Sequence, residues 1–286
     1  MELPHHVLLD KAVGQTPLQC MEAWRIESDT APNVPLTYAG RLDPMASGKL
    51  LVLIGEECKN KDKYLALDKT YEFSVLLGIG SDTHDVLGRL HTQSSTYDED
   101  QSVTMKGKSW PSGLERPELG LTDLKEQLKQ IAADLVGDIE LPYPHFSSKT
   151  VQGKPLHMWT LEGRLDEIEI PTKASTIYSL ELNNIETLSR AEICDQARAK
   201  IDTIPEVTEQ TKSLGNDFRR SDIRQDWEDI KNNPSLPTQY TVTHFTCSAS
   251  SGTYMRTLAK LLGEQLHPAV SSLAWSIHRT DIDILL

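Results

Sequence analysis

The stretch Tyr38-Ala39-Gly40-Arg41-Leu42-Asp43-Pro44-Met45-Ala46-Ser47-Gly48 places one carboxylate on a short loop between two glycines. Pro44 disfavours the helical region for the residue before it, so Asp43 is expected on an extended turn. The flanking glycines permit tight backbone on either side, and the apolar run Leu50–Ile54 is typical of a buried strand. Asp-Pro turns are common in structural loops, but an acid held beside a rigid strand is also well placed for catalysis.

Helical and strand patterns alternate irregularly around this loop. Strands are expected at His6–Asp10, Leu50–Ile54, Thr70–Ile79, Ser175–Leu182, Gln239–Cys247 and Val270–Ile277. Helices are expected at about Thr16–Ile26, Glu56–Leu67, Leu121–Leu135 and Gly252–Leu266. This mixture favours an α+β fold with a central mixed, mostly antiparallel sheet and flanking helices.

Two segments are expected to be insertions in a single domain that spans residues 1–286. The first, at about 91–120, is rich in Ser, Gly, Pro and charge and is predicted to be a loop. The second, at 189–233, is predicted to contain two polar helices, with Ile223 and Trp227 among the apolar positions of the second helix. We expect it to form an accessory helical lobe on the surface.

The formal net charge of −13 argues at first against a nucleic-acid partner, because phosphate binding depends on Lys and Arg. The acid is unevenly distributed, however. Thr30–Gly55 contains only Asp43, and Leu141–Leu161 and Ile230–Gly263 contain no Asp or Glu. Such stretches could simply be buried, or they could converge into one neutral-to-basic face on an acidic body.

Several classes of protein are disfavoured by composition. The four cysteines are far apart, without a C-x-x-C pair, so neither a zinc site nor a disulfide framework is expected. The longest apolar run is too short to span a bilayer, and the first residues do not have the pattern of a signal peptide. We therefore expect a cytoplasmic protein with no metal and no membrane partner.

Six short motifs occur in order along the chain. They are Asp10-Lys11-x-x-Gly14-x-Thr16, Gly40-x-Leu42-Asp43-Pro44-x-Ala46-x-Gly48, Lys69-Thr70-Tyr71-Glu72, Asp82-Thr83-x-Asp85-x-x-Gly88, Ser147-x-x-x-x-Gln152-Gly153-Lys154-Pro155 and Ser251-Gly252-Thr253-Tyr254-x-Arg256-Thr257. Together they resemble the TruB family of tRNA pseudouridine synthases. The resemblance implies the pseudouridine synthase fold with an RNA-binding cleft. It also implies isomerisation of a tRNA uridine, the T-loop uridine 55, with the T-arm stem-loop as partner and without a cofactor.

The resemblance also implies roles for individual residues. Asp43 would be the nucleophile, Tyr71 the aromatic packed on the target base, and Arg256 the partner of Asp43. The other residues implied in substrate binding are Tyr38, Arg41, Lys149, Lys154, Tyr254 and, on a looser alignment, Leu273 as an apolar wall. The segment Leu141–Leu161 would match the loop that closes over the RNA arm.

These residue types suit the reaction on physical grounds. Breaking the N1–C1′ bond of uridine develops positive charge on the ribose, which an ionised carboxylate can stabilise or capture covalently. An adjacent guanidinium favours that ionised form. An aromatic ring can hold a detached base by stacking while the base turns in its plane.

The chain also departs from the family pattern. Tyr38 stands where bacterial members have histidine, and Ala274-Trp275 stands where arginines are common. We expect a divergent, monomeric member that lacks the C-terminal RNA-binding PUA domain. Two alternatives remain open: a non-catalytic RNA-binding or tRNA-folding protein on the same scaffold, and a glycosidase or nucleosidase. The latter usually needs a second carboxylate, and the acid-poor stretches offer none.

Overall fold

The computed structural model describes residues 4–92, 121–204, 219–268 and 270–284. Most of the insertion predicted at 91–120 and the middle of the one predicted at 189–233 lie outside these ranges. In the described part, no helix is long and apolar enough to cross a membrane.

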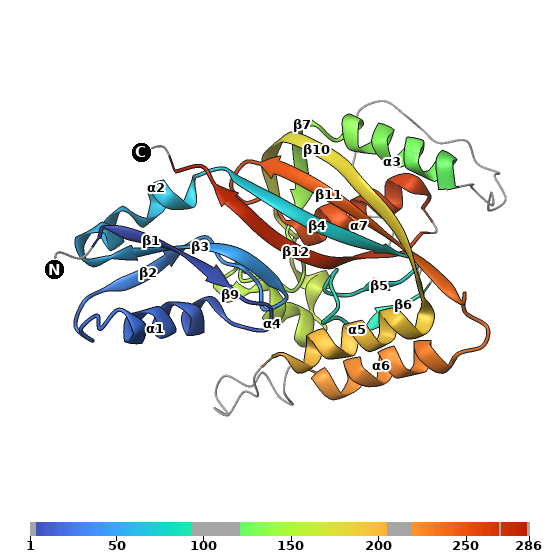
Figure 1. Cartoon of the computed structure of the whole chain (residues 1–286), viewed down its shortest axis with the longest axis horizontal. Coiled ribbons are helices and arrows are strands. Elements are labelled where there is room, and N and C mark those ends of the chain that lie inside the picture. The colour runs from blue at the N-terminus through green and yellow to red at the C-terminus, as the bar shows by residue number, and fades with distance from the viewer. Residues whose placement is uncertain (1–3, 93–120, 205–218, 269, 285–286) are drawn as a thin grey trace.

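The centre of the molecule is one eight-stranded sheet with the order β1-β3-β12-β4-β11-β10-β7, in which β2 also pairs with β3 (Figure 1). Within this sheet β12 and β3 run parallel, and the remaining pairs are antiparallel. The strands are β1 (His6–Lys11), β2 (Leu36–Ala39), β3 (Ala46–Ile54), β4 (Lys69–Leu77), β7 (Gly137–Pro142), β10 (Thr172–Ser189), β11 (Gln239–Ala249) and β12 (Ser272–Ile282). The predicted α+β class and the mostly antiparallel sheet are confirmed.

Helices cover both faces of the sheet (Figure 1). One face of the larger half packs against α3 (Leu121–Asp134) and α7 (Met255–Leu266), around Phe73 and Phe245. In the N-terminal half, α1 and α2 lie on opposite faces of β3. They are α1 (Pro17–Glu27) and α2 (Lys61–Leu65), the latter preceded by a 3-10 helix (Gly55–Asn60). Because both faces of β3 are covered, Leu50–Ile54 is continuously apolar rather than alternating.

The shorter elements are two hairpins and two short helices. They are the hairpin β5 (Gly80–Ser81) and β6 (Leu90–His91), the hairpin β8 (Thr150–Val151) and β9 (Lys154–Pro155), α4 (Leu156–Leu161) and a 3-10 helix (Leu165–Glu167). The hairpins and α4 lie beside the middle of the sheet, where the site is found (Figure 1).

The predicted N-cap of the first helix is confirmed. The Thr16 side chain accepts a hydrogen bond from the Gln19 N–H at 3.1 Å, and the Gln19 side chain accepts one from the Thr16 N–H at 2.8 Å. Pro17 occupies the first turn, where its missing N–H costs nothing.

The boundaries of several elements differ from prediction. The strand expected from Leu50 begins at Ala46, so Gly48 lies inside β3 rather than beside the loop. Its φ is +101°, and a Cβ there would lie 2.1 Å from the Arg279 carbonyl oxygen, since β12 approaches closely. The last strand extends to Ile282 rather than Ile277, because β12 continues to pair with β4 as far as Lys69.

Strand β10 is likewise longer than the predicted Ser175–Leu182, because its polar second half pairs with β11 across a bulge. The helix expected over Glu56–Leu67 is divided into a 3-10 turn and α2.

The predicted surface lobe at 189–233 is wrong in one respect. Its two helices, α5 (Arg190–Asp202) and α6 (Arg220–Asn232), do lie outside the sheet, but they also close one of its faces. Ile193, Ile223 and Trp227 are fully buried against Leu76 and Leu273 of the sheet. The outer faces of α5 and α6 are mostly polar. The overall composition of the segment is therefore polar and does not reveal the buried apolar face.

Candidate active site

The Asp43 loop joins β2 to β3 and is fixed through its backbone. The Asp43 carbonyl accepts a hydrogen bond from the Ala46 N–H at 2.9 Å, and the Pro44 carbonyl accepts one from the Gly14 N–H at 2.8 Å. Leu42 is buried in the core beside β4. The Asp43 side chain remains 45% exposed, so an anchored loop presents a half-exposed carboxylate.

Arg256 pairs with Asp43, as predicted. It lies in the first turn of α7, and its side chain is only 6% exposed, with Nε 2.9 Å from Asp43 Oδ2. The Nε–H is not aligned for a hydrogen bond, so the contact is an ion pair. Its two other nitrogens donate to main-chain carbonyls, Nη1 to Thr83 at 2.8 Å and Nη2 to Phe146 at 3.2 Å.

These contacts bring the three acid-poor stretches together at one point. Asp43 belongs to the first, Phe146 to the second and Arg256 to the third. Burial alone would lower the pKa of Arg256, but Asp43 and Asp85 oppose this effect and the pKa is raised. The guanidinium is therefore a permanent positive charge beside Asp43.

Asp85 is a second carboxylate at this site. Its Oδ2 lies 3.8 Å from Arg256 Nε, and its side chain is 7% exposed. Burial raises the pKa of Asp85, although Arg256 and a hydrogen bond from Thr83 Oγ1 (2.6 Å) act to lower it. The sequence included Asp85 in a motif but gave it no role. Asp85 shares Arg256 Nε with Asp43 and is buried, so it is not exposed to substrate as the second carboxylate of a glycosidase would have to be.

Tyr71 is linked to the Asp43 loop through Arg279 of β12. Arg279 is 2% exposed, and its Nε donates to Tyr71 Oη at 3.2 Å. Its other nitrogens donate to the carbonyls of Gly40 (3.2 Å), Lys49 (3.2 Å) and Arg41 (3.0 Å). Arg279 was not predicted from the sequence, because it lies beyond the motifs and an arginine near the end of a strand usually faces solvent.

Tyr254 stands next to the carboxylate, one residue before α7. Burial raises the pKa of its phenol, and Asp43 raises it further. The Tyr143 ring contacts it edge-on, with centroids 5.6 Å apart. Tyr143, which the sequence did not single out, thus belongs to the aromatic surroundings of Asp43.

A buried lysine also acts on this loop. Lys11 is 1% exposed, and its Nζ donates to the carbonyls of Ala12 (3.0 Å) and Gln15 (2.6 Å). Burial lowers the pKa of Lys11 to about 8, with Asp43 among the groups that oppose this shift. The motif residue Lys11 therefore supports the turn that carries Gly14.

The other predicted site residues are more dispersed. Arg41 is exposed, and Lys149 Nζ lies 5.0 Å from the centroid of the Tyr143 ring. Lys154 forms an ion pair with Glu162 at 2.6 Å and lies 4.0 Å from the Trp159 centroid.

Tyr38 and Leu273 point to core clusters rather than to Asp43. Tyr38 packs on the α1 side of β3, with Lys61 Nζ 5.6 Å from its ring. Leu273 is fully buried among Met45 and Val86. Leu273 and Met45, which lies on the Asp43 loop, belong to the same buried cluster.

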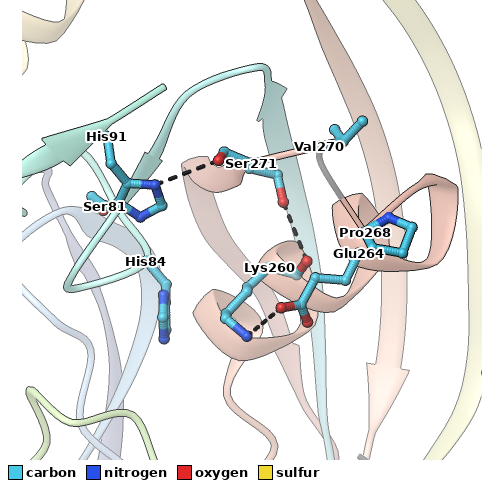
Figure 2. A pocket seen from close by; sticks show the side chains of 9 residues that line it. Ser81, His84, His91, Lys260, Glu264, Pro268, Val270 and Ser271 are labelled. Carbon is cyan, nitrogen blue, oxygen red and sulfur yellow. Dashed lines mark hydrogen bonds and ion pairs between the residues drawn. The ribbon is translucent and has the colours of Figure 1, made fainter. Parts of the chain in front are cut away.

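A small pocket lies away from Asp43, between the β5–β6 hairpin and α7 (Figure 2). Lys260 and Glu264 line it and form an ion pair at 2.5 Å. His84 faces it, and burial, followed by Lys260 and Arg256, lowers the pKa of His84 well below its ordinary value. The paired lysine and the neutral imidazole make this pocket a poor candidate for anion binding. Among the described residues, no group of His, Cys, Asp and Glu is arranged to hold a metal ion.

Comparison with known proteins gives concordant results. Residues 35–111 match the model of the TruB family pseudouridylate synthase (N terminal domain). The chain is 31% identical over 178 residues to tRNA pseudouridine synthase B of Caldicellulosiruptor saccharolyticus, a match that covers 62% of this chain and 51% of the relative. It is 24% identical over 261 residues to tRNA pseudouridine synthase B of Bifidobacterium longum subsp. infantis, covering 91% of this chain and 58% of that relative. It thus spans about half the length of such relatives.

The fold is similar to that of a chain in the crystal structure of a Cbf5-Nop10-Gar1 complex. The TM-score is 0.50 at 14% identity, and the match covers 97% of this chain and 48% of the other. At this identity the likeness concerns the fold alone.

Proposed function

We propose that this chain, whose residues 35–111 match the TruB family model and which is 31% identical over 178 residues to a tRNA pseudouridine synthase B, is itself a tRNA pseudouridine synthase of that family, with the T-loop uridine at position 55 as its target. The observation that carries the proposal is the ion pair between half-exposed Asp43 and buried Arg256 (2.9 Å) on a backbone-anchored loop. A protein that only binds RNA has no need of such a carboxylate.

In the proposed reaction the Asp43 carboxylate attacks C1′ of the ribose as the N1–C1′ bond breaks, and the bonding electron pair leaves with the base. After the base turns, C5 forms a bond to C1′ and the ester bond to Asp43 breaks. C5 then loses its proton and N1 takes one up, so the product is an isomer of the substrate. Arg256 orients Asp43 for both displacements and places a positive charge 2.9 Å from its carboxylate.

The aromatic residues have separate roles in this proposal. Tyr71 would stack on the base while it is detached, and its hydroxyl would help to move the C5 proton. The hydrogen bond from Arg279 Nε stabilises negative charge on that oxygen. Tyr254, in contact with Tyr143, would complete the wall of the pocket around Asp43.

The proposed RNA partner is the T-arm stem-loop. Arg41 lies two residues before Asp43, and Lys149 lies three residues after Phe146. These two cationic side chains would contact the phosphates of the stem-loop. For Lys154 this role is weaker, because Glu162 already compensates its charge. We also propose that the chain is one catalytic domain into which α5 and α6 are integrated.

The test uses tRNA transcribed with uridine tritiated at C5. Isomerisation releases tritium to water and leaves pseudouridine in the RNA, whereas a nucleosidase would release free uracil. A position-resolved map then locates the product, and a protein carrying Asp43→Asn is the control. Absence of tritium release from a folded protein that binds tRNA would favour the non-catalytic alternative.

A further inference from the structure

Two residues of helix α6 form hydrogen bonds with the β5–β6 hairpin and its loop. Trp227 Nε1 donates to the Val86 carbonyl at 3.3 Å. Asp226 accepts two hydrogen bonds from the Arg89 guanidinium, at 2.7 and 3.0 Å, and a third from the Leu90 N–H at 3.0 Å. This loop carries Thr83 and Asp85, and α6 lies beside β6 in the fold (Figure 1).

Arg219, at the start of α6, makes a third contact with this loop. Its guanidinium donates to both carboxylate oxygens of Asp82, at 2.6 and 3.2 Å. The same guanidinium lies 4.5 Å from the centroid of the Phe146 ring. Arg219 therefore joins the β5–β6 loop to the Phe146 segment, which comes from a distant part of the chain.

These two segments are the ones that hold Arg256. The carbonyl of Thr83, next to Asp82, accepts from Nη1, and the carbonyl of Phe146 accepts from Nη2. Displacing either segment would move an acceptor that fixes the Arg256 guanidinium, and hence the charge 2.9 Å from Asp43.

We propose that Arg219 is a positioning residue for the reaction and that α5 and α6 form part of the active-site framework. This inference rests on the proposed function. Arg219 acts through Arg256 and does not touch substrate. A guanidinium suits this role because its planar fork binds a carboxylate with two bonds while its face packs on an aromatic ring.

The other helix of the insertion, α5, reaches the Asp43 loop through Gly14. Thr203, at the C-terminal end of α5, packs against Gly14, where a Cβ would lie 2.4 Å from Thr203 Oγ1. The Gly14 N–H in turn donates to the Pro44 carbonyl, next to Asp43. The two helices thus contact the surroundings of both members of the ion pair.

Contact between Arg219 and RNA phosphate is disfavoured by the same geometry. The Arg219 guanidinium already donates to both carboxylate oxygens of Asp82, and its side chain is only 24% exposed. Loss of Arg219 should therefore change the rate of the bound complex rather than the affinity for RNA.

The experiment compares Arg219→Gln, Arg219→Lys and a matched control, Arg224→Gln, in the full chain. Arg224 pairs with Asp202 at 2.8 Å, so its ion pair joins α6 to α5 and not to the β5–β6 loop or the Phe146 segment. We expect kcat of Arg219→Gln to fall about ten- to a hundredfold, since a misplacement of roughly 1 Å can cost about a hundredfold. KM should stay within about threefold. Arg219→Lys should be intermediate, because lysine retains the charge but not the fork, and Arg224→Gln should retain wild-type kcat.

A double-mutant cycle with Asp82→Asn makes the test sharper. If the Arg219–Asp82 pair acts as a unit, the double variant should be no slower than the slower single variant. The inference is overturned if kcat of Arg219→Gln stays within about twofold of wild type, if KM rises at unchanged kcat, or if Arg224→Gln loses as much. It is also overturned if the effects of Arg219→Gln and Asp82→Asn simply add. An inactive wild-type protein would instead overturn the proposed function, so the two failures are distinguishable.

Discussion

Replacing Arg256 with leucine tests whether one guanidinium serves both carboxylates of the site. Arg256 Nε lies 2.9 Å from Asp43 and 3.8 Å from Asp85. Asp43 is half-exposed and can be solvated by water when its partner is removed. Asp85 is buried and cannot. The cost in stability should therefore arise mainly at Asp85, and the cost in activity at Asp43.

The size and the pH dependence of the stability loss follow from this asymmetry. Removing one partner of a buried ion pair costs about 3–5 kcal/mol. Burial already raises the pKa of Asp85, and Arg256 is the main group that opposes the shift, so Arg256→Leu should raise that pKa further. An acid whose folded-state pKa lies above its unfolded value favours folding when protonated and loses that contribution as pH rises through the folded pKa. The stability deficit of Arg256→Leu should thus be smallest at acidic pH, where Asp85 is protonated, and grow as the pH rises and the buried carboxyl must ionise.

The assay is urea unfolding at a series of pH values, from acidic to mildly alkaline, for wild type, Arg256→Leu, Asp85→Asn and the double variant. In the double variant the buried charge is absent, so most of the stability should return and the added pH dependence should disappear. Activity should not return, because Asp43 still lacks its guanidinium. Losses of about 10²–10³ in kcat are typical when such an electrostatic group is removed.

Two results would refute this reasoning. If the stability deficit of Arg256→Leu is the same at every pH and Asp85→Asn does not restore it, Arg256 is not the counterion of Asp85. If the double variant recovers activity together with stability, Arg256 affects the reaction only by keeping the site folded.

Three further predictions concern the reaction and its substrate. Asp43→Asn removes the negative charge that stabilises the developing ribose cation, so kcat should fall by about three orders of magnitude or more with tRNA binding nearly unchanged. Turnover within tenfold of wild type in a tritium-release assay would contradict the role of Asp43 as nucleophile. Lys149→Gln should raise KM more than Lys154→Gln, because Glu162 already compensates the charge of Lys154. The slope of log KM against log salt concentration should decrease by about one unit for Lys149→Gln and stay unchanged for Lys154→Gln. Equal effects of the two changes would contradict this ranking. An isolated T-arm stem-loop should be modified nearly as well as whole tRNA, measured as kcat/KM, since the proposed reaction requires only that one uridine be flipped out to Asp43. An inert stem-loop would mean that recognition extends to the rest of the tRNA.

The Asp43 loop and its partner illustrate what the sequence could predict. The loop and the strand after it follow from Pro44 and from a continuous apolar run, both local signals. The Asp43–Arg256 pair followed from the resemblance, and the geometry bears it out. The contacts of Arg256 show that the three acid-poor stretches meet. Because Arg256 is buried, the neutral-to-basic face that composition also suggested stays a prediction.

Arg279 and Asp85 illustrate what it could not predict. Each is a charged residue brought to the candidate site by partners from distant strands and loops, and local sequence patterns do not indicate such partners. Arg279 is satisfied by carbonyls of the Asp43 loop because β12 lies beside β3 in parallel. A sequence pattern for α6 shows an apolar stripe with Ile223 and Trp227, but not that the stripe closes the central sheet.

The acidic composition also has a structural explanation once the ion pairs are known. Carboxylates of the insertion and of the β5–β6 loop are engaged within the protein: Asp82 with Arg219, Asp226 with Arg89, and Asp195 with Lys231. Much of the acid near α6 therefore stabilises the framework instead of facing the site. A net charge of −13 still limits long-range attraction of RNA. On the proposed function, affinity must then come from a few short-range contacts around Asp43, and the shape of the loop that contains the uridine must contribute more to selection than the charge of its phosphates.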